Sequence, residues 1–280
     1  MAEVIVAREA GACYGVERAL EMVLAASEEG SPLYTLGPLI HNPVVVGDLE
    51  SRGVHVVEEP SSVPAGSTLV LRTHGVTPEV EKAASAAGVL VLDATCPFVK
   101  RAHRAAERLE REGYQVLLVG EAGHPEVEGT LGHAPQATVV ESAADLEALT
   151  IGRKVGIVVQ TTMAHDKLRA IVAAIVGRTD ELRVIDTICE ATAGHQDACA
   201  ELASTVDVMV VVGGKNSANT THLAEIASAC CAHTYHIETP EELEGAWFAG
   251  ADRIGLTAGA STPAAHIEAV RDAILALAKA

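Results

Sequence analysis

Three cysteines of this sequence have the type and the spacing to act together. Of the six cysteines, Cys13, Cys96 and Cys189 stand 83 and 93 residues apart in a chain of 280 residues. Each follows a predicted strand and comes directly before a predicted helix, in the segments Gly-Ala-Cys-Tyr-Gly, Ala-Thr-Cys-Pro-Phe and Thr-Ile-Cys-Glu-Ala. The repeated position predicts a threefold plan in which these three thiols share one task.

Thiolates from three separate stretches of chain can bind one group only if the fold brings the three stretches together. Thiolate is a soft ligand that favours zinc, Cu(I) or an iron–sulfur cluster. A [4Fe–4S] cluster is usually held by four cysteines, so three would leave one iron open to a substrate. The alternative is a zinc site with three thiolates and one open position. The sequence has no C-x-x-C pair, which disfavours a zinc ribbon or a thioredoxin-type motif.

The other three cysteines have no such placement. Cys199 falls inside a predicted helix, and Cys230 and Cys231 lie near a helix end. A cysteine outside a disulfide most often serves as a small buried apolar side chain. In a reducing compartment an even number of cysteines is no evidence for disulfides. We therefore expect Cys199, Cys230 and Cys231 to have only a packing role.

Six predicted strands end in short polar loops that each open a helix. The polar residues of interest in these loops are His41, His74, His124, Ser217, Asn219 and Ser261. In open α/β sheets ligands bind at the carboxyl ends of strands, and helix N-termini present N–H groups that suit phosphate. Because Lys215 is the one strong cation of these loops, imidazoles would be the main donors to an anionic ligand. Alternatively, the Ser and Asn side chains only cap helices and the histidines are solvated.

Glu126 is the carboxylate best placed for general acid catalysis. It follows His124 and Pro125 at the start of a predicted helix, in one of the six polar loops. A carboxylic acid in such a position can deliver a proton to a reacting group. The alternative is a first-turn glutamate that is favoured only by the helix dipole.

Short β-branched runs alternate with longer helical patterns along nearly the whole chain. Predicted strands cover residues 3–7, 33–36, 54–57, 68–72, 89–92, 115–119, 138–140, 155–159, 182–186, 207–212, 234–237 and 253–257. Strands that alternate with helices predict βαβ units and mainly parallel sheets. We expect an α/β fold of three similar units, covering residues 14–95, 96–188 and 189–280, the last completed by 1–13.

Composition excludes several classes of function. Lys and Arg number 20 and Asp and Glu 38, giving a formal charge of −18. This balance disfavours nucleic acid or an anionic membrane as a partner, because both need a basic face. One Trp, four Tyr and two Phe are too few for stacking platforms on single-stranded nucleic acid. With no apolar run of about 18 residues and no signal-peptide pattern, we expect a cytoplasmic protein.

Nine short motifs, in order along the chain, resemble those of one family. The segments are Cys13-Tyr14-Gly15-Val16, Gly37-Pro38-Leu39-Ile40-His41-Asn42-Pro43, Arg72-Thr73-His74-Gly75-Val76, Asp93-Ala94-Thr95-Cys96-Pro97, His124-Pro125-Glu126-Val127, Gln160-Thr161-Thr162, Thr187-Ile188-Cys189, Gly214-Lys215-Asn216-Ser217 and Thr257-Ala258-Gly259-Ala260-Ser261. The sequence closely resembles the 4-hydroxy-3-methylbut-2-enyl diphosphate reductases of the non-mevalonate isoprenoid pathway. The likeness runs from about residue 8 to 262.

The resemblance implies a complete enzyme site. Members of this family fold as three similar α/β units in a pseudo-threefold trefoil around a central [4Fe–4S] cluster, here bound by Cys13, Cys96 and Cys189. The cluster's open iron takes the hydroxyl oxygen of the allylic diphosphate substrate. The groups that grip the diphosphate correspond to His41, His74, His124, Ser217, Asn219 and Ser261. Glu126 corresponds to the proton donor, and Thr161 to the residue that orients the substrate hydroxyl.

The resemblance also implies the reaction and its partners. Two electrons and two protons remove the hydroxyl as water, which yields isopentenyl or dimethylallyl diphosphate. A ferredoxin or a flavodoxin supplies the electrons in such systems. The chain departs from the family pattern at Ala218, where a second Ser is common, and at His195, where Arg is usual. A zinc hydrolase and an iron–sulfur redox sensor or electron carrier are the competing interpretations.

Overall fold

Twelve strands and nine α-helices alternate along residues 2–278, which are the residues that this computed structural model describes. The strands are β1 Glu3–Val6, β2 Leu33–Leu36, β3 Val54–Val57, β4 Thr68–Leu71, β5 Leu90–Asp93, β6 Gln115–Val119, β7 Thr138–Val140, β8 Lys154–Val159, β9 Glu181–Ile185, β10 Val208–Val212, β11 Thr234–Ile237 and β12 Arg253–Ala258. The helices are α1 Tyr14–Glu28, α2 Pro43–Ser51, α3 Pro78–Ala86, α4 Pro97–Arg111, α5 Pro125–His133, α6 His165–Ile175, α7 Glu190–Ala203, α8 Ala218–Cys230 and α9 Ala264–Leu277. Every predicted strand is present, with each end within one residue of its predicted position.

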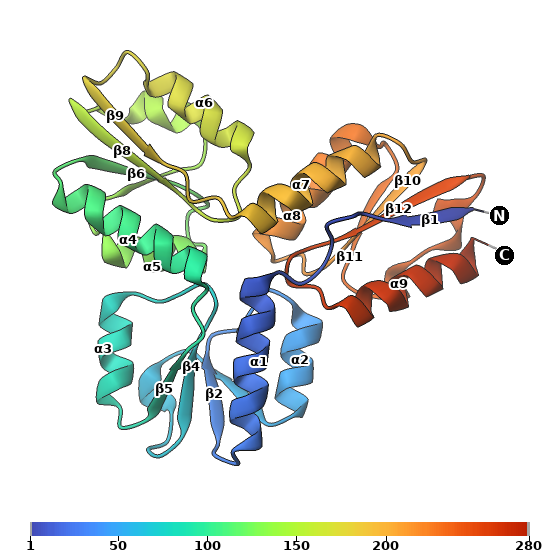
Figure 1. The fold of residues 1–280 in the computed structure, drawn as a ribbon, viewed down its shortest axis with the longest axis horizontal. Helices are drawn as coiled ribbons and strands as arrows, with labels where there is room; N and C mark the ends of the chain where they lie inside the picture. Colours follow the sequence, from blue (N-terminus) through green and yellow to red (C-terminus); the bar gives the residue numbers. More distant parts are fainter. Residues whose placement is uncertain (1, 279–280) are drawn as a thin grey trace. The chain divides into compact units, whose positions relative to one another are not determined.

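The strands form three parallel sheets of four strands each. Their orders are β3-β2-β4-β5, β7-β6-β8-β9 and β11-β10-β12-β1 (Figure 1). The three orders are equivalent, because in each sheet the strand that precedes a cysteine of the Cys13, Cys96 and Cys189 set lies at one edge. The six strands that end in polar loops are the two central strands of each sheet. The predicted α/β fold with three similar parallel units is therefore confirmed.

Two compact units make up the described chain. The terminal unit contains residues 2–16, 41–48 and 190–278 and holds the third sheet. The middle unit contains residues 17–40 and 49–189 and holds the first and second sheets. Strand β1 pairs with β12 from Glu3 opposite Arg253 to Val6 opposite Leu256, so the start of the chain completes the last sheet.

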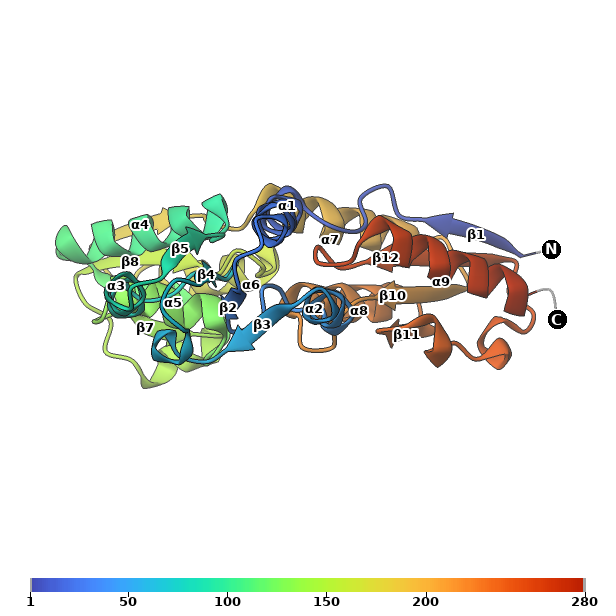
Figure 2. The same cartoon turned by 90° about the horizontal axis from the view of Figure 1, so that it is seen from below.

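Helices cover both faces of the second and third sheets (Figures 1 and 2). In the second sheet, Leu117 and Ile157 pack toward α6, whereas Val116 and Leu118 pack toward α4 and α5. The third sheet repeats this arrangement, with α9 on one face and α7 and α8 on the other. Continuously apolar strands are expected when both faces of a parallel sheet are buried. The polar loops that carry the predicted site residues lie outside this apolar core, at the carboxyl ends of the central strands.

Local sequence fixes where the helices after these strands begin. Proline occupies the first position of α2, α3, α4 and α5, where its missing N–H costs no helix hydrogen bond. At α3 the residue before Pro78 caps the helix, since the Thr77 side chain accepts a hydrogen bond from Val80 N. None of the helices within residues 2–278 has the length and apolar character to cross a membrane.

Candidate functional site

Each of the three spaced cysteines is fixed through its backbone to the loop that follows the neighbouring strand. The bonds run from Cys13 N to Ala260 O (3.0 Å), from Cys96 N to Thr73 O (3.0 Å) and from Cys189 N to Thr161 O (3.1 Å). Two of the three acceptors directly precede a predicted binding residue, and the third is one itself. Each cysteine is therefore held beside a residue that the sequence assigned to substrate binding.

The side chains of these cysteines differ from those of the other three. Cys13, Cys96 and Cys189 are half-buried and come directly before α1, α4 and α7. Helix N-termini favour negative charge, so this position suits a thiolate ligand. Three cysteines in equivalent positions are a donor set whose chemistry fits an iron–sulfur cluster. Cys13 belongs to the terminal unit, whereas Cys96 and Cys189 belong to the middle unit.

The remaining cysteines are mostly inert packing groups. Cys199 is fully buried, its thiol donates to Leu223 O at 3.4 Å, and burial raises the pKa of this thiol to about 12. Cys231 is also buried and donates to Asp207 O at 3.5 Å. These two confirm the expected packing role. Cys230 departs from it, because its side chain is exposed at the end of α8.

The side chain of Glu126 is buried in the middle unit, and one residue hydrogen-bonds both of its carboxylate oxygens. Its side chain is 2% exposed, and its carboxylate accepts hydrogen bonds from Thr161 N (2.6 Å) and Thr161 Oγ1 (2.8 Å). Burial raises the pKa of Glu126 to about 7, although both Thr161 hydrogen bonds act in the opposite direction. A carboxylic acid with a pKa near neutrality is well suited to proton transfer at physiological pH. A first-turn glutamate favoured only by the helix dipole would be exposed, whereas the Glu126 side chain is buried.

His124 caps the helix on which Glu126 lies. Its Nδ1 accepts a hydrogen bond from Glu126 N at 3.1 Å, which makes this histidine the N-cap of α5. Because Nδ1 acts as an acceptor, the neutral ring carries its proton on Nε2. The His74 ring lies edge-on to the His124 ring, with centroids 5.7 Å apart. Two of the predicted anion-binding imidazoles therefore lie side by side.

The predicted residues of the middle unit form one connected series of contacts. Cys96 is bonded to Thr73, the residue before His74, and His74 contacts His124. His124 bonds the backbone of Glu126, which bonds Thr161, which in turn accepts from Cys189 N. The series begins and ends at a cysteine. The structure thus brings together six predicted site residues that span 115 residues of sequence in this unit, from His74 to Cys189.

A second group of predicted residues gathers in the terminal unit. Ser261 Oγ donates to His41 O at 3.3 Å, and Asn42 Nδ2 donates to Ser261 O at 2.9 Å. Gly214, in the loop after β10, lies so close that a Cβ there would be 2.6 Å from His41 O. The loops that carry His41, Ser261 and the start of α8 are therefore in direct contact, and Cys13 is bonded beside Ser261.

Asn219 is the polar residue of this group whose hydrogen-bonding capacity is unused. It is 4% exposed, and both Oδ1 and Nδ2 are buried without a hydrogen-bond partner among the described residues. Ser217 caps α8 by accepting from Thr220 N at 3.4 Å, so its capping role is confirmed. A buried amide without a partner costs free energy, so both polar atoms of Asn219 are available to hydrogen-bond a ligand or a water molecule. The Lys215 ammonium, by contrast, pairs with Glu242 at 2.6 Å.

Asn42 positions two loops of this group, and sequence reasoning did not single it out. It is 2% exposed, and its Oδ1 caps α2 by accepting from Val44 N (3.1 Å) and Val45 N (3.3 Å). Its Nδ2 at the same time fixes the Ser261 loop, 219 residues further along the chain. The signal in the sequence was the Asn-Pro pair that opens a helix, which predicts the cap but not the second bond.

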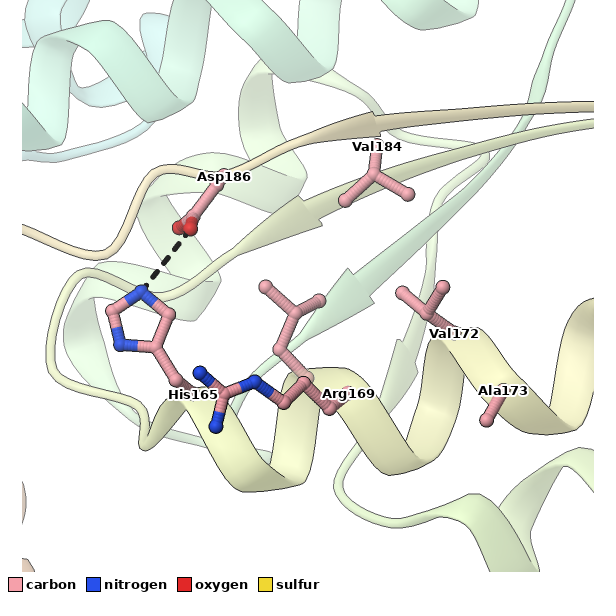
Figure 3. Close-up of a pocket in the computed structure, with 7 residues that line it drawn as sticks. His165, Arg169, Val172, Ala173, Val184 and Asp186 are labelled. Carbon is pink, nitrogen blue, oxygen red and sulfur yellow. Dashed lines mark hydrogen bonds and ion pairs between the residues drawn. The ribbon is translucent and has the colours of Figure 1, made fainter.

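A separate pocket of about 450 Å³ in the middle unit contains none of the predicted site residues. It lies between α6 and β9 and is lined mainly by apolar side chains, with His165 and Asp186 at one end (Figure 3). His165 Nε2 lies 3.2 Å from Asp186 Oδ2, and Arg169 is paired with Asp166. Since these charged groups already have partners, this pocket is a weaker candidate for chemistry than the loops.

No three His, Cys, Asp or Glu side chains within residues 2–278 are gathered closely enough to bind one metal ion. The case for a metal centre therefore depends on the donor set, which is three cysteines in equivalent positions.

Ala218 is the first residue of α8 and is 7% exposed, so only its backbone is available to a ligand at this departure from the family pattern.

Comparison with known proteins gives a consistent result over the whole chain. A family model described as LytB protein matches residues 4–275. The 4-hydroxy-3-methylbut-2-enyl diphosphate reductase of Geobacter sp. (strain M21) is 47% identical over 278 residues, covering 99% of this chain and 98% of that protein. The enzyme of the same name from Aquifex aeolicus (strain VF5) is 44% identical over 279 residues, covering 98% and 96%.

Two solved structures are similar over nearly the same length. One is the (E)-4-hydroxy-3-methyl-but-2-enyl diphosphate reductase described as the terminal enzyme of the non-mevalonate pathway, with a TM-score of 0.73, 45% identity and coverage of 99% of this chain and 100% of that one. The other is the E-1-hydroxy-2-methyl-but-2-enyl-4-diphosphate reductase from Plasmodium falciparum, with a TM-score of 0.90, 29% identity and coverage of 95% and 85%. With a matching family model and relatives above 40% identity along its whole length, the chain belongs to the LytB family of 4-hydroxy-3-methylbut-2-enyl diphosphate reductases.

Proposed function

We propose that this protein reduces (E)-4-hydroxy-3-methylbut-2-enyl diphosphate to isopentenyl diphosphate and dimethylallyl diphosphate. The observation that carries the proposal is the buried Glu126–Thr161 pair, whose Thr161 carbonyl accepts the N–H of Cys189. This contact links a protonatable acid to a candidate metal ligand in one rigid segment. Membership of the reductase family supports the same reaction.

Cys13, Cys96 and Cys189 would hold a [4Fe–4S] cluster in this proposal. Their half-buried thiols at helix N-termini fit thiolate ligands, whereas Cys199 and Cys231 are buried among apolar side chains. When bound, such a cluster would supply electrons and an open iron site for the substrate's hydroxyl oxygen. The electrons would reach it from a ferredoxin or a flavodoxin.

The diphosphate would be bound by two sets of donors. In the terminal unit these are His41, Ser217, Asn219 and Ser261, and Asn219 has both polar atoms available. In the middle unit they are His74 and His124, of which the neutral His124 ring presents its proton on Nε2. Imidazole, hydroxyl and amide groups at helix N-termini can donate hydrogen bonds to an anion. Through such donors the chain can bind an anion although its formal charge is −18.

Glu126 would be the catalytic acid. Because burial raises the pKa of Glu126 to about 7, a large fraction of the molecules carry a protonated Glu126 near neutral pH. The Thr161 hydrogen bonds fix the direction of its carboxyl group. The reaction breaks the allylic C–O bond and consumes two electrons and two protons, releasing the hydroxyl as water. Thr161 would also orient the substrate hydroxyl, and protonation at either end of the allyl group would give the two products.

The remaining parts of the proposal concern organisation and setting. We propose that residues 14–95, 96–188 and 189–280 with 1–13 are three units in a trefoil around the cluster, and that the enzyme acts in the cytoplasm. An iron–sulfur redox sensor or electron carrier needs neither a buried acid nor an unused buried amide such as Asn219. These two features favour an enzyme over a sensor.

The cysteine assignment is tested by four single variants of the anaerobically purified protein. The wild type should be brown, contain about four irons per chain and turn over the allylic diphosphate with a reduced dye. Cys13→Ser, Cys96→Ser and Cys189→Ser should each lose the cluster and abolish turnover, because each removes a thiolate ligand. Cys199→Ser should keep iron and activity. Equal losses in all four variants would refute the assignment, and so would a colourless wild type loaded with zinc.

Glu126→Gln tests the catalytic acid. The variant should retain its iron and its substrate affinity but lose turnover by about 10²–10⁴-fold, the usual contribution of a positioned general acid. Glu128→Gln is the matched control, because it changes an exposed glutamate on the same helix. Substrate binding, iron content and single-turnover rates would be measured together. Full activity of Glu126→Gln would remove Glu126 from the mechanism.

The pH dependence of kcat tests the protonation state of this acid. Because the protonated form is active and burial raises the pKa of Glu126 to about 7, kcat should fall as the pH rises through about 7. Thr161→Val removes one of the hydrogen bonds that lower this pKa, so the falling limb should move to higher pH whatever happens to the maximal rate. A limb that stays in place, or moves to lower pH, would contradict the assignment.

Asn219→Leu tests whether the unused amide serves a ligand. A similarly sized apolar side chain should raise the melting temperature of the cluster-free protein, because a buried amide without partners costs about 1–3 kcal/mol. The same change should raise KM about tenfold through loss of a hydrogen bond to the anion. Asn216→Leu, at an exposed position in the same loop, is the control and should change neither value. A destabilised Asn219→Leu variant with normal KM would contradict a binding role.

A further inference from the structure

His103 is a buried titratable residue that neither the sequence motifs nor the proposed mechanism uses. It lies in the middle of α4, the helix that Cys96 caps, and is 5% exposed. Its Nε2 is buried without a hydrogen-bond partner among the described residues. Burial and the neighbouring His133 lower the pKa of His103 to about 3, so the ring is neutral at physiological pH. A buried neutral ring with an unsatisfied polar atom is a poor choice for stability alone.

Two glycines of the candidate site lie directly against this ring. Gly75 follows His74 in a turn with φ of +73°, and a Cβ on it would lie 2.6 Å from His103 Cε1. Gly129 lies on α5, the helix capped by His124, and a Cβ there would lie 3.4 Å from His103 Nε2. The same Cβ on Gly129 would lie 3.5 Å from His74 O. The His74 turn, α4 and α5 therefore meet at the His103 ring.

A second imidazole fixes the plane of this ring. The ring of His133, in the last turn of α5, stacks on that of His103 with centroids 4.4 Å apart and an interplanar angle of 25°. The other charged groups that act on His103 are Asp93, at the end of β5, and Lys100, on α4. They are paired with each other, so their opposite effects on His103 largely offset. A flat ring stacked in this way fits a narrow space between neighbouring elements. A branched side chain at position 103 would push these elements apart.

We infer that His103 is a positioning residue that sets the spacing between the His74 turn and the His124 end of α5. The inference rests on the proposed function, in which His74 and His124 bind one diphosphate. Their rings are 5.7 Å apart, and the backbones that carry them approach each other through Gly75 and Gly129. Glu126 is held separately by Thr161, so a change at His103 should weaken anion binding more than it alters proton transfer.

The test compares His103→Leu with Leu109→Ala, a fully buried control on the same helix whose side chain packs beside Gly156 instead. Leu109→Ala should lower the melting temperature, because it leaves a cavity in the core. Only His103→Leu should raise the KM of the holoenzyme and the Kd for inorganic pyrophosphate, each by about tenfold, since small misplacements of binding groups carry large penalties. Its iron content, and the pH at which kcat falls, should stay at wild-type values.

Gly129→Val approaches the same junction from the other side and keeps the test informative if His103→Leu does not fold. A Cβ at this position would only make van der Waals contact with His103 Nε2, at 3.4 Å, so a branched side chain is needed to press on the ring. KM and the pyrophosphate Kd of Gly129→Val should both rise. The inference is overturned if Leu109→Ala raises KM as much as His103→Leu does. Normal pyrophosphate affinity in Gly129→Val would also overturn it. A wild type that binds pyrophosphate but does not reduce the allylic substrate would refute the proposed function and leave this comparison intact.

Discussion

One backbone pairing, repeated three times, positions the candidate site. After β1, β5 and β9 the chain remains hydrogen-bonded to the segment beyond the neighbouring strand, so each cysteine continues a parallel ladder instead of entering a loose loop. Buried peptide groups are almost always paired, which makes this continuation energetically favoured. The acceptors are Ala260, Thr73 and Thr161. The first two directly precede a predicted binding residue, and Thr161 is itself one. Any change that breaks the pairing would displace a thiol together with a side chain that is predicted to bind substrate.

The three sheets share this plan but equip it differently. At equivalent helix starts after a central strand, the chain places Asn42, His124 and Ser217, and each caps its helix through a side-chain acceptor. The same position thus yields an amide that fixes a second loop, an imidazole with a defined tautomer and a hydroxyl. Only the second sheet adds a buried carboxyl group, Glu126, after its central strand. A repeated scaffold with unlike side chains is how a symmetric framework can bind an asymmetric molecule.

Local patterns in the sequence predicted the elements, and spatial packing decided the states of the side chains. Apolar runs and proline-marked helix starts were sufficient to place every strand within one residue. The position of Glu126 after a strand was also readable, but the residue that hydrogen-bonds its carboxylate, Thr161, is 35 residues away. The bond between Asn42 and Ser261 spans 219 residues and leaves no periodic signal. His103 looks like an ordinary helical histidine until Gly75 and Gly129 are seen against its ring.

The sealing of Glu126 limits how protons can be supplied. At 2% exposure, with both carboxylate oxygens hydrogen-bonded to Thr161, this group has very little contact with bulk water through which to regain a proton. The proposed reaction consumes two protons, so it needs either a separate donor for the second or a reopening of the site between cycles. In the second case the acid regains its proton when the product leaves, and the overall rate depends on how quickly solvent reaches a single carboxyl group.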